Sequence, residues 1–161
     1  MRKIFTKLLI FGTLALLLHN CATEKSQAYY DYKSKIIASE LDGSYTIRAW
    51  GRARYAADAY EQARKQALRD IIFNGVESST STVQPLKPLI FEVNAEEKYE
   101  TYFNEFFKYG GEYTNYSSTI KQKRIGSSKF AKNEVQCIAE VTVSVDRQKL
   151  KEKLQKDGIL K

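Results

Sequence analysis

The chain has 161 residues, of which 43% are hydrophobic and 28% charged, and its formal net charge is +7. These proportions are those of an ordinary globular domain and exclude a largely disordered chain. The length suits one domain better than two independent cores, so we expect a single folded domain.

The first twenty residues have the pattern of a secretion signal. Three basic residues are followed by an apolar stretch over residues 8–18, which is too short for a comfortable transmembrane helix. The stretch runs into Leu18-His19-Asn20-Cys21, and a leucine three positions before a cysteine resembles the lipobox read by lipoprotein signal peptidase. We therefore expect residues 1–20 to be removed and Cys21 to carry acyl chains.

His19 and Asn20 are larger than the residues of a strict lipobox, so two alternatives stay open: an uncleaved anchor, or an ordinary secretory signal in which Cys21 is incidental. Cleavage before Cys21 would remove three basic and no acidic residues and lower the formal net charge from +7 to +4. This excess favours solubility or contact with an anionic surface over nucleic-acid binding. With Cys21 lipidated, Cys137 would be the one remaining thiol, and no intramolecular disulfide would form.

A polar tether is expected over residues 21–33, with Tyr29, Tyr30 and Tyr32 as candidates for packing back onto a domain over residues 34–161. Ile36, Ile37 and Leu41 predict a short helix or an irregular lead-in that stops at the turn dipeptide Asp42-Gly43.

A first strand is predicted from Ser44, because the pattern there has period two. Tyr45, Ile47, Ala49 and Gly51 would point to one side, and Thr46, Arg48, Trp50 and Arg52 to the other. The segment 54–74 then predicts a helix with an alanine face, closed by Gly75 in the left-handed conformation. Two prolines and a Ser/Thr run make 76–93 a long loop, and its order is left open.

The second half of the chain predicts a helix and a hairpin. Asn94 and Glu97 have the spacing of a capping box, and an aromatic stripe follows to Gly110. A strand is expected over 112–125, a turn at Gly126-Ser127-Ser128, and a return strand over 130–145. Asp146 would cap a last helix over 147–156, closed by Gly158.

The expected fold is therefore α+β: a small antiparallel or mixed sheet with helices packed on one face, in the order β-α-(loop)-α-β-β-α. Within it, the strand ending Ala49-Trp50-Gly51-Arg52-Ala53, the alanine-rich helix ending Leu68-Arg69-Asp70-Ile71, and the late valine-rich strand resemble the LPP-twenty type of small envelope lipoprotein and the FlgT N-terminal domain. The resemblance covers residues 44–75 and 134–155. It implies a fold and a place in the envelope, and it carries no catalytic positions.

The residues give little support for catalysis. His19, the sole histidine, lies in the segment expected to be removed, which leaves no Ser-His-Asp or Cys-His arrangement and no imidazole metal ligand. Cys137 alternates with valines and is expected to be a buried core thiol. The four glutamates of the aromatic helix are expected on its solvated side: Glu96, Glu97, Glu100 and Glu105. We predict no enzyme activity, no cofactor and no metal site.

Two groups of residues are binding candidates. Arg48, Trp50 and Arg52 share one side of the first strand and are typical of a partner-binding surface, unless the second helix covers Trp50. The second group surrounds the expected turn and would contact an anionic surface, unless it is only solvated: Lys121, Lys123, Arg124, Lys129 and Lys132.

These patterns predict a lipid-anchored, non-catalytic lipoprotein that acts as a structural or protein-interaction module. Ala22 after the cysteine resembles the signal for sorting to the outer membrane. The expected partners are the membrane, through the acyl chains, and another envelope protein, with no nucleic acid. The alternative is a binder of a small ligand or glycan. The partner, the process, the side of the membrane faced and the oligomeric state stay open.

Overall fold

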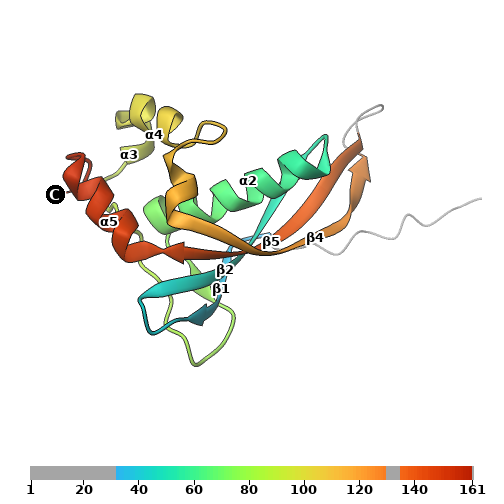
Figure 1. Cartoon of the computed structure of the whole chain (residues 1–161), viewed down its shortest axis with the longest axis horizontal. Coiled ribbons are helices and arrows are strands. Elements are labelled where there is room, and N and C mark those ends of the chain that lie inside the picture. Colours follow the sequence, from blue (N-terminus) through green and yellow to red (C-terminus); the bar gives the residue numbers. More distant parts are fainter. Residues whose placement is uncertain (1–31, 130–134, 161) are drawn as a thin grey trace, which may run out of the picture. The chain divides into compact units, whose positions relative to one another are not determined.

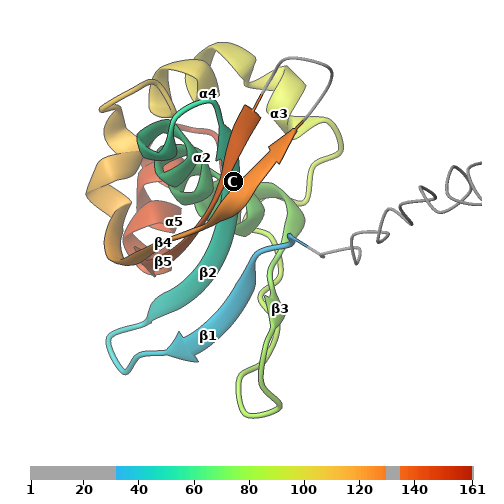
Figure 2. The same ribbon diagram turned by 90° about the vertical axis from the view of Figure 1, so that its right-hand side faces the viewer.

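A five-stranded mixed sheet in the order β3-β1-β2-β5-β4 organises the structure, a computed structural model that describes residues 32–129 and 135–160. The strands β1 (Lys35–Ser39), β2 (Ser44–Ala53), β5 (Val135–Asp146) and β4 (Ser117–Lys129) pair antiparallel with their neighbours. The short strand β3 (Glu77–Ser78) pairs parallel with β1. Helices lie on one side of this sheet (Figure 1; Figure 2), so the α+β prediction is confirmed.

The segment before Asp42 is a strand, and the expectation of a helix or irregular lead-in was wrong. Ile36 pairs with Ile47 of β2 and is fully buried, because a β-branched side chain packs well on a pleated surface. The expected Asp42-Gly43 turn is present: the Asp42 carboxylate accepts from the backbone N–H of Ser44 at 2.9 Å, and Gly43 has a φ of 82°.

The helix α2 (Ala56–Arg69) packs on β2 through its alanine face. A Cβ added at Gly51 would lie 2.2 Å from the carbonyl oxygen of Ala59 and 2.4 Å from the backbone nitrogen of Ala63. Only glycine permits this approach. The side of β2 that carries Gly51 therefore faces the helix, as its alternation predicts.

The last turn of this helix widens into the π-helical segment η2 (Asp70–Asn74), in which the backbone N–H of Gly75 donates to the Asp70 carbonyl at 2.7 Å. The Asp70 carboxylate accepts from the amides of Gln66 and Asn74. The carbonyls of Ile71 and Ile72 accept from Leu89 and Ile90, which attaches the following loop to the helix end. Gly75 ends this segment with a φ of 79° and a ψ of 166°, so its φ is positive but its conformation is not the left-handed helical one that was expected.

The predicted long loop is more structured than expected, and the predicted second helix is interrupted. The loop contributes β3 to the sheet edge and forms a bridge between Val76 and Leu86. The second helix divides into α3 (Ala95–Lys98) and α4 (Glu100–Phe106). The predicted capping box is absent, because Asn94 takes the left-handed conformation with a φ of 58° and makes no side-chain cap. Asparagine tolerates this conformation better than most residues.

The aromatic stripe of α4 enters the core. Phe103 and Phe106 are 3% exposed, and Phe103 meets Phe73 edge-on with 4.7 Å between ring centroids. Residues 112–116, expected in a strand, instead form the 3-10 helix η3 (Glu112–Tyr116), whose Tyr113 is fully buried. Burial of that ring against Phe107 overrides the local preference of Tyr and Thr for a strand.

The C-terminal helix α5 (Arg147–Lys156) forms as predicted. The Asp146 carboxylate accepts from the backbone N–H of Lys149 at 2.9 Å, and Leu150 and Leu154 are fully buried. Gly158, with a φ of 73°, follows the helix.

A polar network joins α4, η3 and α5. The Tyr102 hydroxyl donates to Asp157 Oδ2 at 2.6 Å, and Lys153 Nζ lies 2.8 Å from Glu112 and 3.1 Å from Asp157. Burial would raise the pKa of Asp157, but the hydrogen bonds from Tyr102 and Lys153 outweigh it and lower the pKa below its ordinary value.

Candidate functional site

We call the side of the sheet that faces away from α2 the open face. It carries the first group of candidate binding residues and part of the second. Within β2, Ile47, Ala49 and Gly51 point toward the helix, so Arg48, Trp50 and Arg52 point away from it. The shared side predicted for these three residues is confirmed. Arg48 and Arg52 are exposed and Trp50 is half-buried.

Strand pairing adds more cations to the open face. Arg48 pairs across β5 residue Thr142 to Lys121 of β4, and Trp50 pairs across Glu140 to Lys123. Residues paired in a sheet share a face, so both lysines lie beside the β2 residues.

On the other side of β2, Lys35 of β1 pairs with Arg48, and Glu77 of β3 pairs with Lys35. With Arg48, Arg52, Lys121 and Lys123, strand pairing gives the open face five cations against three carboxylates, Glu77, Glu140 and Asp146, a formal charge of +2. Asp146 lies at the end of β5, where its carboxylate caps α5. Sequence spacing alone gives no sign that Lys35 belongs here, because its strand was not predicted.

Trp50 is partly covered by Tyr32 and not by the second helix. The two rings meet edge-on with centroids 6.3 Å apart, and the Arg52 guanidinium lies 4.7 Å from the centre of the Tyr32 ring. The helices α3 and α4 lie on the α2 side of the sheet, so the alternative that the second helix covers Trp50 is wrong (Figure 1). Tyr32 packs back onto the domain, whereas Tyr29 and Tyr30 lie outside the described residues.

The Arg48 side chain approaches Glu140 with 3.9 Å between Nε and Oε1, and the two side chains are 45% and 24% exposed. An exposed pair at this distance contributes little to stability. The open face therefore keeps most of its positive charge available to a partner.

The predicted basic hairpin needs correction. Gly126 is not in a turn: it lies within β4 and pairs with Ile138, and β4 continues to Lys129. Pairing with β5 keeps Gly126, Ser127 and Ser128 extended despite their turn-forming composition. Arg124 pairs with Ala139 and so shares the helix side of the sheet, away from Lys121 and Lys123. Lys132 lies outside the described residues.

Thiols and clusters of possible metal ligands are sparse in the part of the chain that the structure describes. Cys137 is half-exposed instead of buried, since it pairs with Ala53 at the end of β2, before α2 begins at Ala56. Among residues 32–129 and 135–160, no group of three or more His, Cys, Asp or Glu side chains is arranged to hold a metal ion. Nor does any helix in those two ranges have the length and apolarity needed to cross a bilayer.

The clefts lined by described residues include three that lie among the helices and their loops, away from the open face. A cleft of about 520 Å³ between α2 and α3–α4 is lined by Lys65, Arg69, Glu96, Glu97 and Glu100, among others. Arg69 and Glu96 form an ion pair within it. The remaining glutamate of this group, Glu105, is exposed and pairs with Lys108. Exposed glutamates paired with surface cations are what the solvated side of a helix carries.

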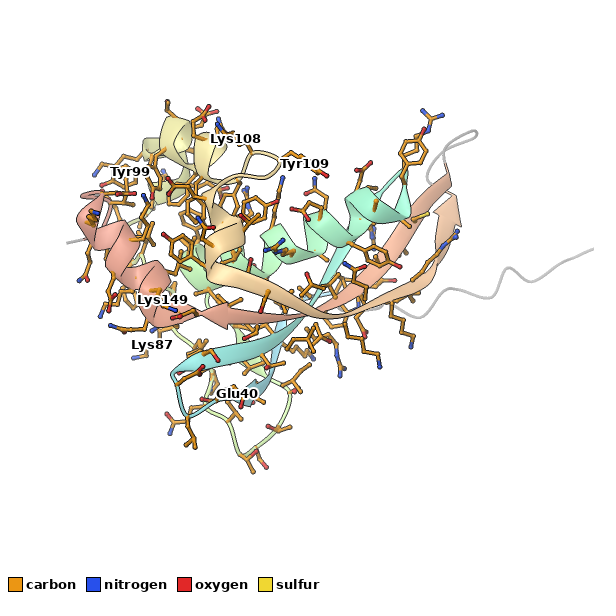
Figure 3. The ribbon with its side chains drawn as sticks, in the orientation of Figure 1. Glu40, Lys87, Tyr99, Lys108, Tyr109 and Lys149 are labelled. Carbon is orange, nitrogen blue, oxygen red and sulfur yellow. The ribbon has the colours of Figure 1, made fainter. Side chains whose placement is uncertain are left out.

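The other two clefts have volumes of about 400 and 430 Å³. Tyr102 is the tyrosine that lines the first of them, and the second has none in its lining. A cluster of tyrosines in a cleft, which would favour a glycan or small-ligand site, is therefore absent from these three clefts. Figure 3 shows Tyr99, Lys108 and Tyr109 on the helix side of the sheet.

Comparisons with protein-family models, with curated proteins and with solved structures each found no match to this chain. The resemblance to small envelope lipoproteins consequently rests on the residue pattern alone.

Proposed function

We propose that this protein is a lipid-anchored, non-catalytic lipoprotein of the bacterial envelope that acts as a structural or protein-interaction module at the outer membrane. The observation that carries the proposal is the position of Cys21, which follows the apolar run 8–18 directly and has a leucine three positions before it. The LPP-twenty-like pattern of residues 44–75 and 134–155 supports it.

The shape of the described part supports a binding role. The open face is basic and has a half-buried tryptophan, whereas the clefts among the helices are lined by charged groups that already pair with one another, such as Arg69 and Glu96. A half-buried aromatic residue between exposed arginines is suited to contact with a partner, either a protein or a membrane surface. Ala22, in place of the aspartate of inner-membrane retention, supports the outer membrane as its location.

The test is an intact-mass and detergent-partition measurement on the protein purified from membranes. We expect the native protein to have lost residues 1–20, to have gained acyl mass and to enter the detergent phase. Cys21→Ser should do none of these, because the thiol that accepts the lipid is gone. Cys137→Ser is the matched control and should behave as the native protein does, since it removes the other thiol.

Two outcomes would overturn the proposal. A native protein without acyl mass in the aqueous phase would make Cys21 incidental and the protein a secreted or periplasmic binding domain. A Cys21→Ser protein that is still cleaved after residue 20 and still partitions into detergent would show that something other than an acylated cysteine holds it there.

A further inference from the structure

We propose that the open face rests on the anionic lipid headgroups of the membrane in which Cys21 is anchored. The inference builds on the lipid anchor proposed above and names the partner of the open face. Two independent features of the structure carry it: the chemistry of the face and the point at which the chain leaves the fold.

The charge of the open face is available to phosphate groups. Lys121, Lys123 and Arg52 form no ion pair with any described residue, and the Arg52 guanidinium lies over the Tyr32 ring. Arg48 has its one carboxylate partner at 3.9 Å. Basic groups held within a Debye length of an anionic leaflet are attracted to it, and several on one surface add up.

The composition of the face fits a lipid surface better than a protein partner. Three of its five cations are lysines, Lys35, Lys121 and Lys123, and lysine is depleted in the cores of protein–protein interfaces. Trp50 and Tyr32 meet at its centre, and such amphipathic rings are favoured at the level of lipid headgroups.

The position of Tyr32 brings the open face to the membrane. Tyr32 is the first described residue, and its ring lies against Trp50 and Arg52, so the described part of the chain begins at the open face. Cys21 precedes Tyr32 by eleven residues, which span at most about 40 Å when fully extended. An anchor at Cys21 would thus lie within one short tether of this face, which allows the face to reach the bilayer surface.

Trp50 is the only tryptophan in the chain, so its fluorescence reports directly on the open face. The purified acylated protein is reconstituted into two kinds of vesicle: phosphatidylcholine alone, and phosphatidylcholine with phosphatidylglycerol. The emission maximum and the quenching by aqueous acrylamide are recorded at low and high salt. On the phosphatidylglycerol vesicles we expect a blue shift and weaker quenching at low salt, and loss of both near 1 M salt, where the Debye length falls to about 3 Å.

Two variants with the same change in net charge separate the open face from general basicity. The first replaces open-face cations by glutamine and keeps the reporter: Arg48→Gln, Arg52→Gln, Lys121→Gln and Lys123→Gln. The second replaces one lysine shortly after α4 and three lysines of α5: Lys108→Gln, Lys149→Gln, Lys151→Gln and Lys156→Gln. The first variant should lose the blue shift and the protection from acrylamide, and the second should retain both. Urea unfolding of each variant checks that the fold is intact.

The outcomes distinguish this inference from the proposed anchor. If the protein associates with vesicles but Trp50 is equally accessible on both lipids, the anchor stands and the contact with lipid headgroups is wrong. Equal protection on both lipids at all salt concentrations also overturns it, because the contact is then not electrostatic. Protection by a soluble acidic polypeptide in the absence of vesicles, with none on phosphatidylglycerol, would assign the face to an acidic protein. If no acylated protein is obtained at all, the proposed anchor itself fails.

Discussion

The two faces of one strand, β2, differ in what they do for the protein. On the helix side, Ile47 and Ala49 are fully buried and Gly51 touches the backbone of α2. On the open face, Arg48 and Arg52 are exposed. Because side chains alternate along a strand, the residues that pack against α2 and those of the proposed binding surface are neighbours in the chain but lie on opposite sides of the sheet. Substitutions on the two sides should therefore have different consequences, and each of the following tests compares a residue among the helices or packed against them with a residue of the open face.

The largest difference is expected between Ile47→Ala and Trp50→Ala. Ile47 is fully buried, and its truncation leaves a cavity under α2 that should lower the free energy of unfolding by about 4 kcal/mol. Trp50 lies at the surface and is partly exposed, so removing its ring leaves no closed cavity and should cost about 1 kcal/mol. Urea unfolding monitored by far-ultraviolet circular dichroism measures both. Equal losses for the two variants would make Trp50 a core residue and would break the comparison.

The next difference concerns two glycines in neighbouring parts of the sheet. Gly51→Ala places a Cβ within 2.4 Å of two backbone atoms of α2, and forcing the helix away should cost about 3 kcal/mol. Gly126→Ala has nothing within 4 Å of the new Cβ and should change the stability by no more than about 0.5 kcal/mol. The same unfolding measurement serves for both. A well-tolerated alanine at position 51 would contradict the packing of α2 on β2.

The smallest difference is electrostatic and depends on pH. The Asp157 carboxylate receives hydrogen bonds from Tyr102 and Lys153, and its folded-state pKa lies below the ordinary value of 3.8. Its contribution to stability is thus complete above pH 3.8 and is lost as the pH falls through the lowered pKa. We expect Asp157→Asn to cost about 1 kcal/mol at neutral pH and less in strong acid. The exposed pair of Arg48 and Glu140 provides the contrast.

For that pair, Glu140→Gln should change the stability by less than about 0.5 kcal/mol, since its Arg48 partner is exposed and 3.9 Å away. Denaturant unfolding of both variants at about pH 6 and about pH 2 gives the comparison. A cost for Asp157→Asn that is the same at both pH values would show that its hydrogen bonds act through geometry alone.

The elements with strict alternation or an alanine face were predicted well, and two of the failures occur where strand pairing overrides local composition. The alternation of β2 and β5, the alanine face of α2 and the cap at Asp146 all follow from short-range rules. Gly126 and its two serines have the composition of a turn, yet β5 continues alongside them and holds them extended. Ile36 in β1 has no alternating neighbours, and its strand exists because β2 pairs with it.

The sequence by itself determined which residues of β2 share a side, and so it placed Arg48, Trp50 and Arg52 together, because side-chain alternation is a local property of the chain. It also named Lys121 and Lys123, as two of five cations around an expected turn. Only the tertiary structure decided that these two groups form one surface. The strand order β1-β2-β5-β4 sets that neighbourhood, and it is a choice among distant segments that no local pattern specifies.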